Sequence, residues 1–97
     1  MANYKLSSQA QFDLVGIYKY GIKYFGQQQA VSYLYELEDF MLELATRPEL
    51  AKDASKLGET LKYYNFKAHV IFYFHEDGDE IFIIRILGKR MDFVQHL

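Results

Sequence analysis

Apolar residues recur at helical spacing soon after the N-terminus. Ser7 and Ser8 are both suited to cap a helix, and Gln11 is placed to complete a capping box with Ser8. The apolar stripe that follows is Leu14, Ile17, Gly21 and Phe25. This spacing predicts a helix that ends at Gly26, because glycine readily adopts the left-handed conformation of a helix terminus.

The same spacing resumes at Gln28 and predicts a second helix. Its apolar stripe is Ala30, Tyr33, Leu37, Phe40 and Leu44. Pro48 disfavours helical geometry at Arg47 and marks the end of this helix. Because one glycine separates the two helices, we expect an antiparallel helical hairpin.

The second half of the chain changes to the alternation typical of strands. The stretch PELAKDASKLGET, residues 48–60, is polar and without periodicity, so we expect a surface loop with at most one helical turn. LKYYNF and HVIFYFH then follow a period of two. In the second of these, Val70, Phe72 and Phe74 alternate with His69, Ile71, Tyr73 and His75. This pattern predicts a strand with one face richer in polar groups.

A final strand is expected from Glu80 to Leu87, joined to the preceding strand by the hairpin signal Asp77-Gly78. One face of this strand carries Phe82, Ile84 and Ile86, and the other carries Ile81, Ile83, Arg85 and Leu87. Both faces are mainly apolar, which predicts a central strand covered on both sides. Tyr4-Lys5-Leu6 predicts a short opening strand.

Length and composition restrict the class of protein. A chain of 97 residues fits one domain, residues 1–97. It has no cysteine, and its net charge is −2 without blocks of like charge, which disfavours direct nucleic-acid binding. The N-terminus lacks the apolar run of a signal peptide, and no segment is long enough to cross a bilayer. We therefore expect a cytoplasmic protein that does not associate with membranes.

Arg85 is the notable charge of the final strand. A partly buried guanidinium is costly unless a carboxylate or several carbonyls accept its protons. One interpretation is a structural ion pair, with Asp92 as a candidate partner. The other is a cation held in a concave sheet face to meet an acidic or phosphate group of a partner.

The histidines and basic residues give no catalytic or metal-binding signature. His69 and His75 lie six residues apart on one strand, so roughly 20 Å separates them and they cannot share a metal. With His96 as the third histidine, the spacing fits neither a metalloenzyme nor a Ser-His-Asp hydrolase, and we expect no catalytic residues, metal or cofactor. A nuclease would need basic side chains to converge, but charges in loops usually scatter. The candidates are Lys52, Lys56, Lys62, Arg85, Lys89 and Arg90.

Aromatic residues are numerous for so small a core, with nine Tyr and eight Phe. Several gather on the predicted hairpin: Tyr18, Tyr20, Tyr24, Phe25, Tyr33 and Tyr35. Core packing explains those on the stripe, whereas Tyr20 and Tyr35 lie off it. These positions favour a groove that accepts another protein chain.

Several segments together resemble the ParE-type toxins of the RelE/ParE superfamily. They are YKLSSQAQFDLVGIYKYGIKYFG, the stretch from Ala30 to Leu37, HVIFY, IRIL and RMDFVQHL. The resemblance implies an α+β fold of order β-α-α-β-β-β, with the helical hairpin packed on a mainly antiparallel four-stranded sheet. It also implies a toxin of a type II toxin-antitoxin system that poisons bacterial DNA gyrase by binding, without being an enzyme, and is neutralised by a ParD-like antitoxin.

The resemblance assigns roles to two sets of residues. Target contacts are expected from the concave sheet face and the C-terminal tail: Arg85, Lys89, Arg90, Met91, Phe93 and His96. The antitoxin, folding onto the hairpin as an amphipathic helix, is expected to contact Tyr20, Tyr24, Phe25, Tyr33, Tyr35 and Leu37. Operator DNA would be reached only through the antitoxin, and a homodimer is possible.

The sequence departs from its relatives at two places, and two other functions compete. A Gly-Leu-Arg triplet of relatives is Thr60-Leu61-Lys62 here, and a histidine after the IRIL strand is Gly88. Lysine loses the bidentate geometry of arginine, so the family role of that arginine is in doubt at Lys62. RelE-like relatives cleave messenger RNA on the ribosome, but here no tyrosine follows Tyr73 to act as acid or base. The third alternative is a degenerate member that only binds its antitoxin.

Overall fold

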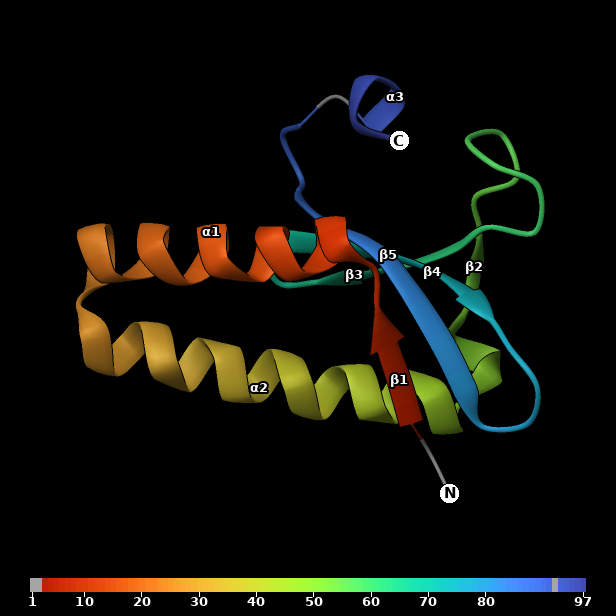
Figure 1. Ribbon diagram of the computed structural model, residues 1–97, viewed down its shortest axis with the longest axis horizontal. Coiled ribbons are helices and arrows are strands. Elements are labelled where there is room, and N and C mark those ends of the chain that lie inside the picture. The colour runs from red at the N-terminus through yellow and green to blue at the C-terminus, as the bar shows by residue number, and fades with distance from the viewer. Residues whose placement is uncertain (1–2, 92) are drawn as a thin grey trace.

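A helical hairpin covers one face of a five-stranded sheet in the computed structural model, which describes residues 3–91 and 93–97 (Figure 1). The helices are α1 (Ser8–Phe25), α2 (Gln27–Thr46), the one-turn 3-10 helix η1 (Pro48–Leu50) and α3 (Phe93–His96). The strands are β1 (Asn3–Leu6), β2 (Lys52–Asp53), β3 (Lys62–Phe66), β4 (His69–His75) and β5 (Glu80–Gly88). The predicted α+β class and the order of its main elements are confirmed.

Local sequence signals determine where the helices begin and end. Ser7 caps α1: its hydroxyl accepts a hydrogen bond from the Ala10 amide at 3.0 Å and donates one to the Ile84 carbonyl at 2.7 Å. The predicted capping box from Ser8 is wrong, because Gln11 instead donates to the Leu6 carbonyl. Gly26 alone joins α1 to α2, with a φ of 91° that a residue with a side chain rarely adopts.

The sheet has the order β1-β5-β4-β3-β2, in which β1 runs parallel to β5 and the other neighbours are antiparallel. β2 is a strand that the sequence did not predict. It pairs with β3 through two residues, Lys52 and Asp53, which are too few to show an alternating pattern. The sheet therefore has five strands rather than the expected four.

A register shift between β4 and β5 changes which side chains share a face. Phe72 lies opposite Arg85, but the next residue, Tyr73, lies opposite Ile83, so Ile84 is an extra residue on β5. Ile81, Ile83 and Ile86 all join the core beneath the helices, whereas Leu87 belongs to the core of the opposite face. The prediction that Ile81, Ile83, Arg85 and Leu87 share one face is wrong for this reason, because Ile81 and Ile83 lie on the opposite side of the sheet from Leu87.

Two hydrophobic cores lie on opposite sides of the sheet. The core beneath the helices contains Leu37, Met41 and Leu44 of α2, packed on the strands. The second core contains Ala54, Leu61, Val70, Phe72 and Leu87, with Phe93 packed against it. β5 is covered on both sides, as predicted, and so is β4, whose residues 70–73 are all buried. The β4 face that was predicted to be richer in polar groups lies beneath the helices, where Ile71 and Tyr73 are buried in the core. The opposite face, with Val70 and Phe72, is covered by apolar side chains of the segment 54–61 and by Phe93.

Candidate functional site

Arg85 connects the sheet, α1 and the C-terminal helix. Its Nε and Nη2 each donate to one carboxylate oxygen of Asp13 at 2.9 Å. Its Nη1 donates to the main-chain carbonyl of His96 at 2.6 Å. The side chains of Arg85 and Asp13 are only 15% and 13% exposed, and the hydrogen bonds that Arg85 donates to Asp13 raise the pKa of Arg85. The guanidinium thus forms a structural ion pair with Asp13; Asp92, the candidate from the sequence, lies outside the described residues.

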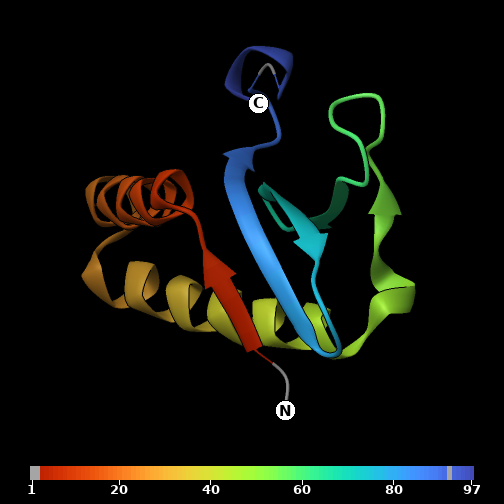
Figure 2. The same ribbon diagram turned by 45° about the vertical axis from the view of Figure 1, so that its right-hand side comes forward.

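The C-terminal segment passes from β5 to the face of the sheet away from the helices. Beyond Gly88, the Lys89 amide donates to the Ala68 carbonyl at 3.1 Å and ties this segment to the turn before β4. In α3, the ring of Phe93 meets the ring of Phe72 edge-on, with centroids 5.1 Å apart. Figure 2 shows α3 and the loop between β2 and β3 standing apart at the same end of the sheet.

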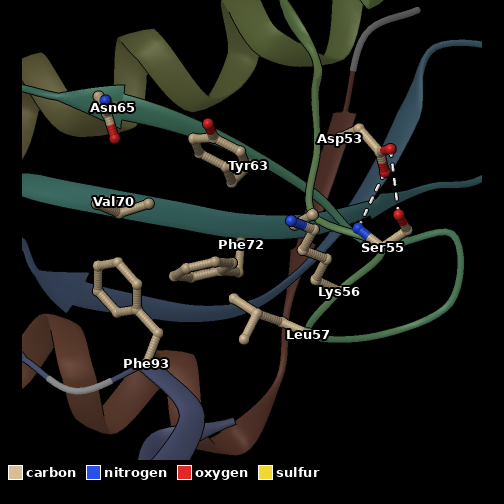
Figure 3. Close-up of a pocket in the computed structure, with 10 residues that line it drawn as sticks. Asp53, Ser55, Lys56, Leu57, Tyr63, Asn65, Val70, Phe72 and Phe93 are labelled. Atoms are coloured by element: carbon tan, nitrogen blue, oxygen red, sulfur yellow. Dashed lines mark hydrogen bonds between the residues drawn. The ribbon is translucent and has the colours of Figure 1, made fainter.

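A cleft of about 660 Å³ lies between these two segments, and we call it the sheet cleft. Its apolar lining includes Val70, Phe72 and Phe93, and Figure 3 shows Leu57 beside the Phe72 ring. Polar groups line it as well: Asp53, Ser55, Lys56, Tyr63 and Asn65. The Asp53 carboxylate already accepts hydrogen bonds from the Ser55 amide at 2.9 Å and from the Ser55 hydroxyl at 3.1 Å.

A second hollow of about 800 Å³ runs between α1 and the end of β5, and we call it the α1 groove. From α1 it is lined by Phe12, Asp13, Gly16, Ile17 and Tyr20, and from the sheet and tail by Ala68, His69, Ile86, Gly88, Lys89, Arg90 and Met91. A Cβ at Gly16 would meet no atom within 4 Å, so the groove is open there. The lining of the groove combines apolar residues with two exposed cations, Lys89 and Arg90.

The structure divides the expected target contacts between these two hollows. Lys89, Arg90 and Met91 line the α1 groove, whereas Phe93 lines the sheet cleft. Arg85 lies beneath the tail and holds the His96 carbonyl. The residues are close along the chain but do not form one continuous hollow.

Three of the expected antitoxin contacts gather at the free end of the helical hairpin. Tyr20, Tyr24 and Phe25 are 60%, 57% and 60% exposed. The ring of Tyr20 lies 4.5 Å from that of Tyr24 and 6.5 Å from that of Phe25, between centroids. We call these three residues the aromatic tip. Phe25 was predicted on the buried stripe of the first helix, and its exposure corrects that assignment.

The other three expected antitoxin contacts lie elsewhere. Tyr35 is exposed on α2, as its position off the stripe predicts. Tyr33 is half-buried, and its hydroxyl lies 2.7 Å from Nδ1 of His69. Leu37 is 0% exposed in the core beneath the helices, so a partner cannot reach its side chain. We therefore remove Leu37 from the expected contact surface.

Sequence reasoning missed two residues of the α1 groove. Phe12 is 76% exposed, and its position off the apolar stripe was the available signal. Asp13 had no sequence signal, because its partner Arg85 is 72 positions away.

The six basic candidates do not converge. Lys56 lines the sheet cleft, while Lys89 and Arg90 line the α1 groove. The Lys52 ammonium lies 5.8 Å from the Tyr64 ring centroid, and Lys62 stands on β3 opposite Asp53. Within residues 3–91 and 93–97, no three His, Asp or Glu side chains come together to hold a metal ion. No helix of these residues has the length and apolar character needed to cross a membrane.

The fold and its hollows define a class: a small α+β protein in which a helical hairpin covers one face of a mixed sheet and the C-terminal segment lies on the other. A model of the family described as "ParE toxin of type II toxin-antitoxin system, parDE" matches residues 4–93, so the chain belongs to the ParE toxin family. The resemblance seen in the sequence is confirmed.

Individual relatives agree with this assignment. The chain is 31% identical over 97 residues to "Toxin ParE" of Escherichia coli, covering 100% of this chain and 94% of that protein. It is also 31% identical over 97 residues to "Toxin ParE1" of Caulobacter vibrioides, covering 100% of this chain and 99% of that protein. A solved structure described as "Chromosomal ParDE TA system from P. aeruginosa" shares the fold, with a TM-score of 0.74 at 20% identity over 91% of this chain and 96% of that chain.

Proposed function

We propose that this protein is the toxin partner of a ParD-like antitoxin and that it poisons bacterial DNA gyrase in the cytoplasm by binding. The observation that carries the proposal is the family match across residues 4–93. A relative described as a ParDE system with the same fold supports a ParD-like partner for this chain. The action is that of a bound protein surface, with no covalent bond made or broken.

The antitoxin surface is the aromatic tip together with the α1 groove. Exposed rings supply large contact area at low entropic cost, which suits them to anchor a partner segment. Tyr20 belongs to both features, so they are continuous. Because Lys89 and Arg90 line the groove beside apolar residues, the matching antitoxin segment is amphipathic, with both apolar residues and carboxylates.

The proposed gyrase surface is the C-terminal tail, residues 89–97, which follows β5. Lys89, Arg90 and Met91 are exposed there and present two cations and a flexible apolar side chain. Arg85 contributes mainly by holding the tail, since both of its carboxylate-facing donors are occupied by Asp13.

The arrangement of polar groups supports binding rather than catalysis. In the sheet cleft, Asp53 is occupied by Ser55, and Lys56 is the cation among the described lining residues. A phosphoryl-cleaving site needs a general acid or base beside convergent cations. In the α1 groove, His69 shares the lining with Lys89 and Arg90, but its Nδ1 is engaged in a hydrogen bond with the Tyr33 hydroxyl.

Purified protein in gyrase supercoiling and cleavage assays tests the proposal. We expect inhibition with accumulation of cleaved DNA at micromolar toxin, reversed by the antitoxin encoded next to its gene. Arg90→Ala and Met91→Ala should each raise the inhibitory concentration at least about tenfold, which corresponds to about 1.4 kcal/mol of binding. Glu38→Ala, an exposed change on α2, is the control and should leave inhibition unchanged.

Two results would overturn the proposal. One is a folded sample that leaves gyrase activity intact at all concentrations tested. The other is ribosome-dependent cleavage of messenger RNA by the purified protein, which would identify the RelE-like ribonuclease instead.

A further inference from the structure

The Asp13 carboxylate on α1 accepts hydrogen bonds from two residues of β5, Arg85 and Ile86. It accepts from Nε and Nη2 of Arg85, and Oδ2 also accepts from the Ile86 amide at 2.9 Å. One side chain on α1 therefore fixes both the Arg85 side chain and the backbone of β5 next to it. The pair is largely shielded from water, which strengthens such charge-assisted bonds.

The planar guanidinium transmits this constraint to the tail. When two of its nitrogens are held by one carboxylate, the direction of the third nitrogen is set as well. That third nitrogen, Nη1, donates to the His96 carbonyl in α3 at 2.6 Å. Asp13 thus determines, through Arg85, where the His96 carbonyl can bond.

The tail depends on such tertiary contacts. α3 spans four residues, and a helix this short is not stable by itself in water. The contacts of its described residues with the rest of the protein include the Phe93 ring against Phe72 and the His96 carbonyl on Arg85. Loss of the second contact leaves an aromatic contact that does not define the direction of the segment.

We propose that Asp13 is a positioning residue that docks the C-terminal segment 93–97 against the sheet through Arg85. The inference deepens the proposed function and rests on it for one consequence: the docked tail is the form that engages gyrase. Asp13 also lines the α1 groove, so a ligand in that groove contacts the residue that sets the tail.

Fluorescence measures the docking directly, because the chain has no tryptophan. F93W places an indole against Phe72 as a reporter. In this host, Asp13→Ala should shift the emission to longer wavelength and raise acrylamide quenching at least about twofold. Trypsin should also cut faster after the exposed Lys89 and Arg90.

A second variant separates tail docking from the packing of α1. Asp13→Asn keeps an oxygen that accepts from the Ile86 amide but removes the carboxylate that holds the guanidinium fork. It should therefore undock the indole of F93W while circular dichroism stays that of the folded host. The unfolding midpoint should fall, because the largely buried Arg85 guanidinium loses its carboxylate partner. Glu43→Ala, which removes the exposed α2 ion pair with Arg47, is the matched control and should change neither signal.

The outcomes are distinguishable. If folded Asp13→Asn leaves emission, quenching and cleavage as in the host, Asp13 does not position the tail and the inference is wrong. The proposed function is tested separately by adding wild-type protein and Asp13→Asn, both without the reporter, to the gyrase assay. Failure of the wild type there removes the proposed function but leaves the fluorescence result standing.

Discussion

The phenolic hydroxyl of Tyr33 on α2 lies 2.7 Å from Nδ1 of His69 at the start of β4. Burial raises the pKa of Tyr33 and lowers the pKa of His69, so both side chains are neutral near pH 7. The two neutral groups share one hydrogen bond, in which the tautomer of His69 sets the donor. This bond joins the helical hairpin to the sheet, where the Tyr33 ring also packs on Phe66.

Acidification should destabilise the protein through His69. Because its folded-state pKa is lowered below 6.5, the unfolded chain binds more protons than the folded protein as the pH falls below about 6.5. The free energy of unfolding should therefore decrease with falling pH in this window. Urea unfolding from about pH 8 to about pH 5 measures the slope, and His69→Gln should reduce it. An identical slope in the variant would contradict the assignment.

Tyr73 should tolerate loss of its hydroxyl. This hydroxyl is buried and has no hydrogen-bond partner among the described residues, and burial raises its pKa to about 12. An unsatisfied buried polar group costs about 1 kcal/mol or more. Tyr73→Phe should thus be as stable as the wild type or more stable by up to about 1 kcal/mol, measured by chemical denaturation. A loss of stability would show that the hydroxyl has a stabilising partner.

Two glycines of α1 should respond differently to alanine. A Cβ at Gly21 would lie 3.0 Å from the Ala30 Cβ, where α1 and α2 approach closely, whereas a Cβ at Gly16 meets nothing within 4 Å. Gly16→Ala should stabilise the helix by up to about 1 kcal/mol. In Gly21→Ala the close contact with Ala30 should offset this stabilisation. The thermal midpoint of Gly21→Ala should therefore be lower than that of Gly16→Ala. Equal midpoints would mean that the hairpin relaxes freely.

The aromatic tip should matter for antitoxin binding but not for folding. Tyr24→Ala and Phe25→Ala remove exposed rings, so the free energy of unfolding should change by less than about 0.5 kcal/mol. If these rings anchor the antitoxin, affinity should fall at least about tenfold, or about 1.4 kcal/mol, in titration calorimetry. Leu42→Ala, an exposed apolar residue of α2 outside the proposed surface, serves as control. Unchanged affinity in both tip variants would move the antitoxin surface elsewhere.

Truncation after Gly88 should abolish toxicity and leave antitoxin binding weaker but measurable, because the α1 groove loses Lys89, Arg90 and Met91. The deletion removes Lys89 to Leu97 and with them the proposed gyrase surface, while the aromatic tip and hairpin remain. It also uncovers Phe72 and frees Nη1 of Arg85, so a modest fall in the thermal midpoint is expected. Growth on induction and antitoxin pull-down measure the two effects. A truncated chain that remains fully toxic would show that the tail is dispensable.

The sequence by itself determined the order and type of the main elements, because the relevant signals are local. The spacing of the apolar stripes, the break at Gly26 and the turn at Asp77-Gly78 each act within a few residues. The same signals located both strands of the central hairpin. They also identified Tyr20 and Tyr35 as residues exposed off the stripe.

Tertiary structure alone decided the arrangement around Arg85. The extra residue Ile84 in β5 reverses the alternation of faces, and the pattern in one strand does not reveal where its neighbour shifts register. The partner of Arg85 is Asp13, 72 positions away, because folding places α1 beside β5. β2 exists through pairing with β3, and Phe93 of the C-terminal helix covers the apolar face of β4 at Phe72. These features depend on contacts between distant segments, which a period of two or of 3.6 residues does not encode.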